Sequence, residues 1–165
     1  MKTVSVCFVC LGNICRSPTA EGVMRHFVHE AQLTDRILID SAGTGDWHIG
    51  EAPDERAQQA ARERGYDIGT LRGRQVTSAD FARFDLLVAM DERNIAALRQ
   101  LCPPALRDRI RLLMEFVPEM DNRWNGAREV VDPYFGDSEG FAQVLDQCEA
   151  ACSGLVAVLR AKLGA

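Results

Sequence analysis

The sequence has no hydrophobic run long enough to cross a membrane, although 47% of its 165 residues are hydrophobic. The apolar run Val4–Leu11 is short, and no small-residue cleavage site follows it, so we expect neither a membrane anchor nor a signal peptide. Basic residues are not in excess, because 19 Lys and Arg stand against 24 Asp and Glu. The net charge of −5 argues against a nucleic-acid surface. Without repeats or low-complexity segments, the length predicts one domain, 1–165.

The chain also lacks the spacings that mark disulfide frameworks and zinc sites. None of its six cysteines forms a Cys-x-x-Cys pair, and their pattern is unlike that of a secreted scaffold. The histidines at 26, 29 and 48 have no zinc-ligand spacing relative to the cysteines. We therefore expect reduced thiols, a cytoplasmic protein, and no metal or cofactor.

The most informative stretch is Cys10–Pro18, which reads Cys-Leu-Gly-Asn-Ile-Cys-Arg-Ser-Pro. It stands between an apolar run, Val4–Val9, and a helix-like pattern, Thr19–Gln32. A strand, a tight loop and a helix start in this order aim backbone N–H groups and the positive end of the helix dipole at one point. This arrangement predicts a site for a tetrahedral oxyanion such as phosphate. The same field favours the thiolate of Cys10, and the planar guanidinium of Arg16 can grip two phosphate oxygens.

The spacing Cys-x5-Arg-Ser is typical of the signature loop of cysteine-dependent phosphatases. Placed after the first strand, and with Asp-Pro-Tyr at 132–134, it resembles the low-molecular-weight protein tyrosine phosphatase family over nearly the whole chain. The resemblance implies metal-independent hydrolysis of phosphotyrosine in proteins, and of small aryl phosphates, through a cysteinyl-phosphate intermediate.

Three residues are the candidates for catalysis. Cys10 is the candidate nucleophile, Arg16 would bind the equatorial oxygens of the transition state, and Asp132 would be general acid and then general base. Each has a plainer alternative: a core thiol for Cys10, a surface arginine for Arg16 and a turn for Asp132. The other candidates for phosphate binding belong to the same loop: Leu11, Gly12, Asn13, Ile14, Cys15 and Ser17.

Three polar residues are expected to support the loop. The Ser17 hydroxyl can donate to the Cys10 sulfur, cap the following helix, or do both. Asn13 tolerates a left-handed backbone and can shape the loop. The resemblance makes Ser41 the partner that holds Asn13, although an ordinary loop serine is the alternative.

Aromatic and redox candidates complete the predicted site. Trp47 and Tyr134 would form walls that stack on a substrate ring. Phe135 stands where many eukaryotic relatives have a second tyrosine, and the segment 71–74 lacks the histidine that many relatives place behind the loop. Cys15 is either a redox partner of Cys10 or a small packing residue.

Beyond the loop, apolar runs alternate with helical patterns. Predicted strands cover 36–40, 85–90 and 109–114; predicted helices cover 54–64, 91–101 and 137–163, with a short helix opened by a Thr77–Asp80 capping box and a long loop at 115–131. This order predicts an α/β fold with a parallel sheet covered on both faces, and the resemblance implies four strands. Ligands of such folds bind at the carboxyl ends of the strands, where Cys10, the 41–50 loop and Asp91 would meet.

Two other functions share these features. An arsenate reductase of the same fold would need two further cysteines on a mobile segment, but 77–100 has none and Cys102 is alone. A non-catalytic phosphate-binding module would not need Cys10, Arg16 and Asp132 together. The expected partner is a phosphotyrosine-containing protein, which in bacteria is often a tyrosine kinase, and the expected state is a monomer or weak dimer.

Overall fold

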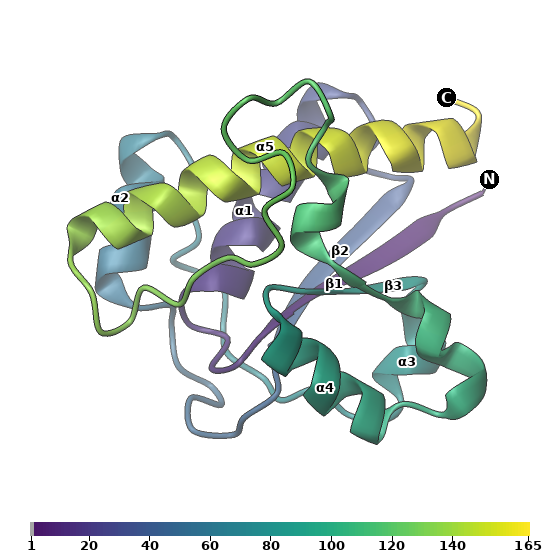
Figure 1. Cartoon of the computed structure of the whole chain (residues 1–165), viewed down its shortest axis with the longest axis horizontal. Helices are drawn as coiled ribbons and strands as arrows, with labels where there is room; N and C mark the ends of the chain where they lie inside the picture. Colours follow the sequence, from purple (N-terminus) through teal and green to yellow (C-terminus); the bar gives the residue numbers. More distant parts are fainter. Residues whose placement is uncertain (1) are drawn as a thin grey trace.

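A four-stranded parallel sheet forms the centre of the computed structural model, which describes residues 2–165 (Figure 1). The strands are β1 Val4–Cys10, β2 Ile37–Gly43, β3 Leu86–Ala89 and β4 Ile110–Leu112, in the order β2-β1-β3-β4. The helices are α1 Arg16–Glu30, α2 Glu55–Glu63, α3 Asp80–Arg83, α4 Glu92–Leu101 and α5 Ser138–Leu163, with 3-10 turns η1 Pro104–Arg109 and η2 Leu113–Phe116. The predicted α/β class and the four parallel strands are confirmed.

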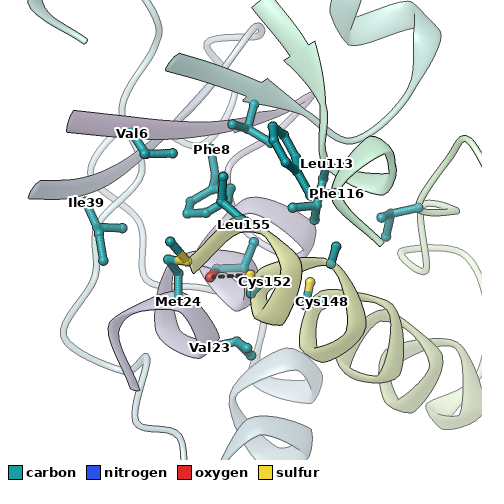
Figure 2. Packing of buried hydrophobic residues seen from close by; sticks show 14 of the residues in the cluster. Val6, Phe8, Val23, Met24, Ile39, Leu113, Phe116, Cys148, Cys152 and Leu155 are labelled. Atoms are coloured by element: carbon teal, nitrogen blue, oxygen red, sulfur yellow. Dashed lines mark hydrogen bonds between the residues drawn. The ribbon is translucent and has the colours of Figure 1, made fainter. Parts of the chain in front are cut away.

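Side chains of β1 alternate between two apolar layers, because successive residues of a strand point to opposite faces. Val6 and Phe8 belong to the layer beneath α1 and α5, whereas Cys7 and Val9 belong to the layer that includes residues of α3 and α4. Figure 2 shows the first layer, in which Met24 of α1 and Leu155 of α5 lie close to Phe8. Both faces of the sheet are thus covered, as the apolar strands indicated.

Four local predictions differ from the structure. The second strand runs from Ile37 to Gly43 instead of ending at Asp40, so Ser41 lies in a strand and the expected 41–50 loop starts only after Gly43. The first helix begins at Arg16 instead of Thr19, with Cys15 at its N-cap, so the capping alternative for Ser17 is wrong. The fourth strand is only three residues long, because the Leu112 N–H turns to the Glu115 carboxylate and starts η2. The expected capping box at 77–80 is half formed: the Thr77 N–H donates to Asp80, but α3 begins at Asp80 itself.

The order of the strands reverses at β1, whose neighbours β2 and β3 both follow it in the chain. This reversal opens a crevice at the carboxyl end of β1, which is where ligands bind in doubly wound sheets. Cys10 is the last residue of β1 and lies at this point. No helix within residues 2–165 is long and apolar enough to span a membrane.

Candidate active site

The loop between β1 and α1 turns sharply at Asn13, whose φ of 57° lies in the left-handed region. Asparagine tolerates this conformation better than most residues, as the sequence indicated. The Cys10 and Leu11 carbonyls accept hydrogen bonds from Thr44 and Gly45, both at 2.9 Å. The start of the loop is therefore bound to the segment that follows β2.

Two groups approach the Cys10 sulfur inside this loop. The Asn13 backbone N–H donates to Sγ at 3.3 Å, and the Ser17 hydroxyl lies 3.0 Å from Sγ. The Ser17 oxygen accepts a hydrogen bond from Asn13 Nδ2 at 2.8 Å, which leaves its own hydrogen free to donate to the sulfur. Hydrogen bonds of this kind stabilise a thiolate, which is the nucleophilic form of cysteine.

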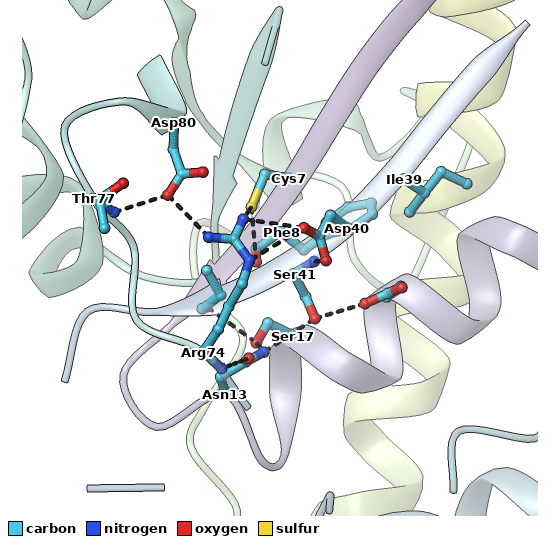
Figure 3. A network of polar contacts seen from close by, with 12 residues as sticks. Cys7, Phe8, Asn13, Ser17, Ile39, Asp40, Ser41, Arg74, Thr77 and Asp80 are labelled. Atoms are coloured by element: carbon cyan, nitrogen blue, oxygen red, sulfur yellow. Dashed lines mark hydrogen bonds and ion pairs between the residues drawn. The ribbon is translucent and has the colours of Figure 1, made fainter. Parts of the chain in front are cut away.

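The Asn13 side chain is the anchor beneath the loop (Figure 3). Its amide nitrogen also donates to Ser41 Oγ at 3.0 Å, and its oxygen accepts from the Arg74 backbone N–H at 3.0 Å. Ser41 in turn donates to the buried Glu21 carboxylate at 2.7 Å. The predicted pairing of Asn13 with Ser41 is confirmed, and Arg74 and Glu21 take part where the sequence offered no histidine in 71–74.

Arg16 is 2% exposed and is held in place by two acceptors. Its Nη1 donates to Asp91 Oδ2 at 2.6 Å and to the Val130 carbonyl at 2.9 Å. Burial alone would lower the pKa of this guanidinium, but Cys10, Asp91 and Asp132 raise that pKa above its ordinary value. Arg16 is therefore a permanent cation beside the Cys10 sulfur, and its Nη2 faces the Asp132 carboxylate at 3.5 Å.

Asp91 is held in place by its own helix, α4, as well as by Arg16. It caps α4 by accepting a hydrogen bond from the Asn94 N–H at 2.8 Å, and its own N–H donates to the Asn94 side-chain oxygen at 3.3 Å. The sequence placed Asp91 at the end of the third strand but gave no sign that it pairs with Arg16. The capping pattern of α4 indicates only that one Asp91 carboxylate oxygen caps the helix. The other oxygen is then available for Arg16.

Asp132 lies across the crevice from the loop. Its Oδ1 accepts from the Tyr134 N–H at 3.1 Å, and its Oδ2 lies 3.5 Å from Arg16 Nη2. The Asp132 side chain is 44% exposed, so the carboxylate can exchange protons with water. This position, near Cys10 but open to solvent, suits a group that first gives and then takes a proton.

A pocket of about 250 Å³ opens over Cys10. Its lining comprises Cys10, Leu11, Gly12, Ile14, Cys15, Arg16, Trp47, His48, Asp132, Tyr134 and Phe135. The structure thus brings together the predicted catalytic residues, the loop and both predicted walls. Asn13, Ser17 and Ser41 do not line this pocket, and His48 and Phe135 were not expected in it.

The walls differ in how they are supported. Trp47 is 66% exposed, whereas Tyr134 is 38% exposed and packs edge-on against Phe135 with ring centroids 4.9 Å apart. His48 lies against Gly12, and its Nδ1 is 3.0 Å from the Glu51 carboxylate. A larger, more open hollow of about 740 Å³ between α2 and the start of α5 includes no residue of the loop, so the smaller pocket is the candidate site.

Cys15 lies in the same loop but in a different environment. It is buried, and this burial, followed by the nearby Asp54 and Cys10, raises the pKa of its thiol. The Cys15 thiol is therefore protonated at neutral pH.

Comparisons with known proteins agree with this geometry. The family model described as "Low molecular weight phosphotyrosine protein phosphatase" matches residues 5–165. The chain is 44% identical to a low molecular weight protein-tyrosine-phosphatase of Streptomyces coelicolor, covering 96% of this chain and 94% of the relative. It is 38% identical to the low molecular weight phosphotyrosine protein phosphatase of Sus scrofa, covering 96% and 97%.

Solved structures give the same result. A protein tyrosine phosphatase from Entamoeba histolytica superposes with a TM-score of 0.89 at 37% identity, covering 98% of this chain and 99% of that one. Wzb from Vibrio vulnificus, solved in complex with benzylphosphonate, superposes with a TM-score of 0.78 at 27% identity, covering 93% and 97%.

Proposed function

Because the chain belongs to the low molecular weight phosphotyrosine protein phosphatase family and is a protein tyrosine phosphatase of that kind, we propose that it hydrolyses phosphotyrosine through a cysteinyl-phosphate on Cys10. The observation that carries this proposal is the Cys10 sulfur. It accepts the Asn13 N–H, lies 3.0 Å from the Ser17 hydroxyl, and shares one pocket with Arg16 and Asp132.

In the first step the phosphate binds between the backbone N–H groups of residues 11–16 and the free face of Arg16. The Cys10 thiolate attacks phosphorus, and the bond from phosphorus to the phenolic oxygen breaks. Asp132 gives its proton to that oxygen, so that neutral tyrosine leaves. Arg16 stabilises the charge that spreads over the equatorial oxygens of the transition state.

In the second step the cysteinyl-phosphate is hydrolysed. Asp132, now a carboxylate, takes a proton from a water molecule, whose oxygen attacks phosphorus. The sulfur–phosphorus bond breaks, and the Ser17 hydroxyl stabilises the departing Cys10 thiolate. No metal ion takes part in either step of this mechanism.

The walls of the pocket select an aromatic ester. Trp47 and Tyr134 stand on the rim above Cys10, where a phosphorylated phenol ring would pass between them. The relative solved with benzylphosphonate, in which an aromatic ring is joined to a phosphonate, supports a ligand of this shape. We infer that the physiological substrate is a phosphotyrosine-containing protein, and in a bacterium a tyrosine kinase.

Further properties follow from the same proposal. Residues 1–165 act as one phosphatase domain, as a monomer or weak dimer. The six free cysteines favour the cytoplasm, where thiols stay reduced.

Under peroxide, the Cys10 thiolate would take one oxygen to form a sulfenic acid. The Cys15 thiol would then attack the Cys10 sulfur, and the oxygen would leave as water. The product is a disulfide that a thiol reductant reopens.

The nucleophile is tested with Cys10→Ser. Turnover of p-nitrophenyl phosphate should vanish, because a hydroxyl is far less nucleophilic than a thiolate at neutral pH. Binding of inorganic phosphate, measured by calorimetry, should persist, because backbone N–H groups and Arg16 supply the contacts. Cys102→Ser, which changes a buried thiol outside the pocket, should retain full activity. Appreciable turnover by Cys10→Ser would remove Cys10 from the mechanism.

The acid is tested by changing the leaving group. Asp132→Ala should slow the first step with phosphotyrosine, measured as kcat/KM, by about 10²–10⁴-fold, the usual contribution of a general acid. It should slow p-nitrophenyl phosphate much less, because nitrophenolate leaves without a proton. A single common factor for both substrates would show that Asp132 only shapes the turn, and Asp91 would then be the first alternative acid.

A further inference from the structure

Arg56, in the first turn of α2, joins two parts of the molecule that are far apart in the sequence. Its Nη2 donates to the Tyr134 carbonyl at 2.9 Å, and its Nε and Nη2 grip both oxygens of Asp54 at 3.0 and 2.9 Å. Figure 1 shows α2 beside the start of α5, and the turn at 132–136 comes directly before that helix in the chain. One guanidinium therefore fastens this turn to α2.

Tyr134 connects Arg56 to Asp132 through its backbone. Its carbonyl is held by Arg56, and its N–H donates to Asp132 Oδ1 at 3.1 Å. The turn is closed by a second hydrogen bond, from the Gly136 N–H to the Pro133 carbonyl at 3.0 Å. The N–H of Tyr134 thus contacts the Asp132 carboxylate, and the carbonyl of the same residue, one peptide unit further along the chain, is held by Arg56.

The side chain of Tyr134 is restrained by the same group. The Arg56 Cζ lies 5.5 Å from the centre of the Tyr134 ring and 4.7 Å from the centre of the Phe141 ring in α5. A guanidinium at such distances attracts an aromatic face. Arg56 therefore holds both the backbone and the ring of the residue that forms one wall of the pocket.

Asp54 connects this restraint to the phosphate loop. Its backbone N–H donates to the Ile14 carbonyl at 2.8 Å, and its carboxylate accepts from the Arg56 backbone N–H at 2.8 Å as the cap of α2. The hydrogen bonds to Arg56 hold the pKa of Asp54 below its ordinary value, so the pair is ionised at neutral pH. A continuous path runs from Ile14 through Asp54 and Arg56 to Tyr134.

We propose that Arg56 is a positioning residue for the reaction: it sets the turn of residues 132–134, and thereby the Asp132 carboxylate, at a fixed place relative to the phosphate loop. This inference rests on the proposed role of Asp132 as general acid. Arg56 itself does not line the pocket over Cys10, so it acts through Tyr134 and not on the substrate.

The test compares Arg56→Met with Arg56→Lys and with a control on the same helix, Arg62→Met. Arg62 donates to Gln59 one turn away, so its loss leaves the turn untouched. Small displacements of catalytic groups can cost up to about 10²-fold, so Arg56→Met should lower kcat/KM for phenyl phosphate by about tenfold or more. The kcat/KM for p-nitrophenyl phosphate should fall much less, and the inhibition constant of inorganic phosphate should stay within about twofold of the unmodified protein, because the phosphate loop is retained.

The lysine variant separates charge from geometry. An ammonium can keep one hydrogen bond to the Tyr134 carbonyl but cannot bind both oxygens of Asp54 at the same time. Arg56→Lys should therefore restore only part of the activity that Arg56→Met loses. Arg62→Met should behave like the unmodified protein. Equal losses for Arg62→Met and Arg56→Met would overturn the inference, as would full restoration by lysine.

A double-mutant cycle gives the decisive readout. If Arg56 acts through Asp132, then adding Arg56→Met to Asp132→Ala should change kcat/KM for phenyl phosphate by less than about twofold. A further large loss in that background would overturn the inference while leaving the acid in place. If Asp132→Ala alone shows no leaving-group dependence, the proposed acid is wrong and the role of Arg56 falls with it.

Discussion

At the scale of single residues, the site depends on how differently the fold treats chemically identical thiols. Cys7, Cys15, Cys148 and Cys152 are buried, and burial raises the pKa of each thiol. Cys10 is also buried, but its sulfur meets the Asn13 N–H and the Ser17 hydroxyl at the base of an open pocket. Contacts of the sulfur, and not burial alone, therefore distinguish Cys10, the proposed nucleophile, from the other buried cysteines.

This difference predicts selective alkylation. A group with a raised pKa stays protonated until the pH rises above that pKa, so the four structural thiols should resist iodoacetate at pH 7. Cys10 should be carboxymethylated first, with loss of activity in step, and inorganic phosphate should protect it. Peptide mass spectrometry over a time course makes the measurement. Labelling of Cys15 as fast as Cys10 would contradict this account of the loop.

Residues of one short motif could be predicted from the sequence, whereas contacts between residues of distant segments could not. Cys10, Arg16 and Asn13 could be predicted because their roles follow from one short motif with a strand before it and a helix after it. Asp91 and Glu21 could not be assigned, because their contacts with Arg16 and Ser41 depend on which helix positions face the loop. Such pairings between distant segments appear only when the chain is folded.

At the scale of elements, the apolar strands were predictable because each is buried, while boundaries depended on single hydrogen bonds. The expected loop at 115–131 begins with a 3-10 turn, η2, that packs against α5. The contact occurs at Gly154, which in the sequence is only a glycine inside a helix. A Cβ added there would lie 1.7 Å from the Phe116 carbonyl oxygen, so the glycine permits the close approach.

Gly154→Ala should therefore destabilise the protein. Inside an exposed helix, alanine is more favourable than glycine by roughly 0.5–1 kcal/mol. Here overpacking of the alanine Cβ against a backbone atom should outweigh this gain in helix propensity. The free energy of unfolding should fall by about 1–3 kcal/mol. Urea unfolding measures the change, with Ser153→Ala as control, since the adjacent Ser153 is exposed and its replacement should alter stability by no more than about 0.5 kcal/mol. A Gly154→Ala variant as stable as the unmodified protein would show that α5 and η2 separate freely.

At the scale of the whole molecule, the pocket is assembled from segments that follow different strands. Cys10 and Arg16 come from the end of β1 and the start of α1, Trp47 from the loop after β2 and Asp132 from the segment before α5. Asp91, which follows β3, does not line the pocket but holds Arg16. The topology predicts this convergence, because the carboxyl ends of parallel strands meet at one edge of the sheet. It does not predict the hydrogen bond of Arg16 with the Val130 carbonyl, which depends on the path of the long connection from η2 to α5.

Because ligand contacts span these segments, inorganic phosphate should stabilise the entire fold. A ligand that binds only the folded state adds about 2.7 kcal/mol at 100 times its Kd, which for a domain of this size corresponds to a rise in Tm of roughly 5–10 °C. Calorimetric melting with phosphate, against sodium chloride at equal ionic strength, measures the shift. Cys10→Ser should keep most of it, since the cradle is formed by backbone N–H groups and Arg16. Arg16→Ala should lose it, because the one buried cation that links the loop to Asp91 and to the segment at Val130 is then gone. A shift of equal size in Arg16→Ala would mean that phosphate binds at another surface of the protein. Arg16 would then not be the group that couples the two sides of the crevice.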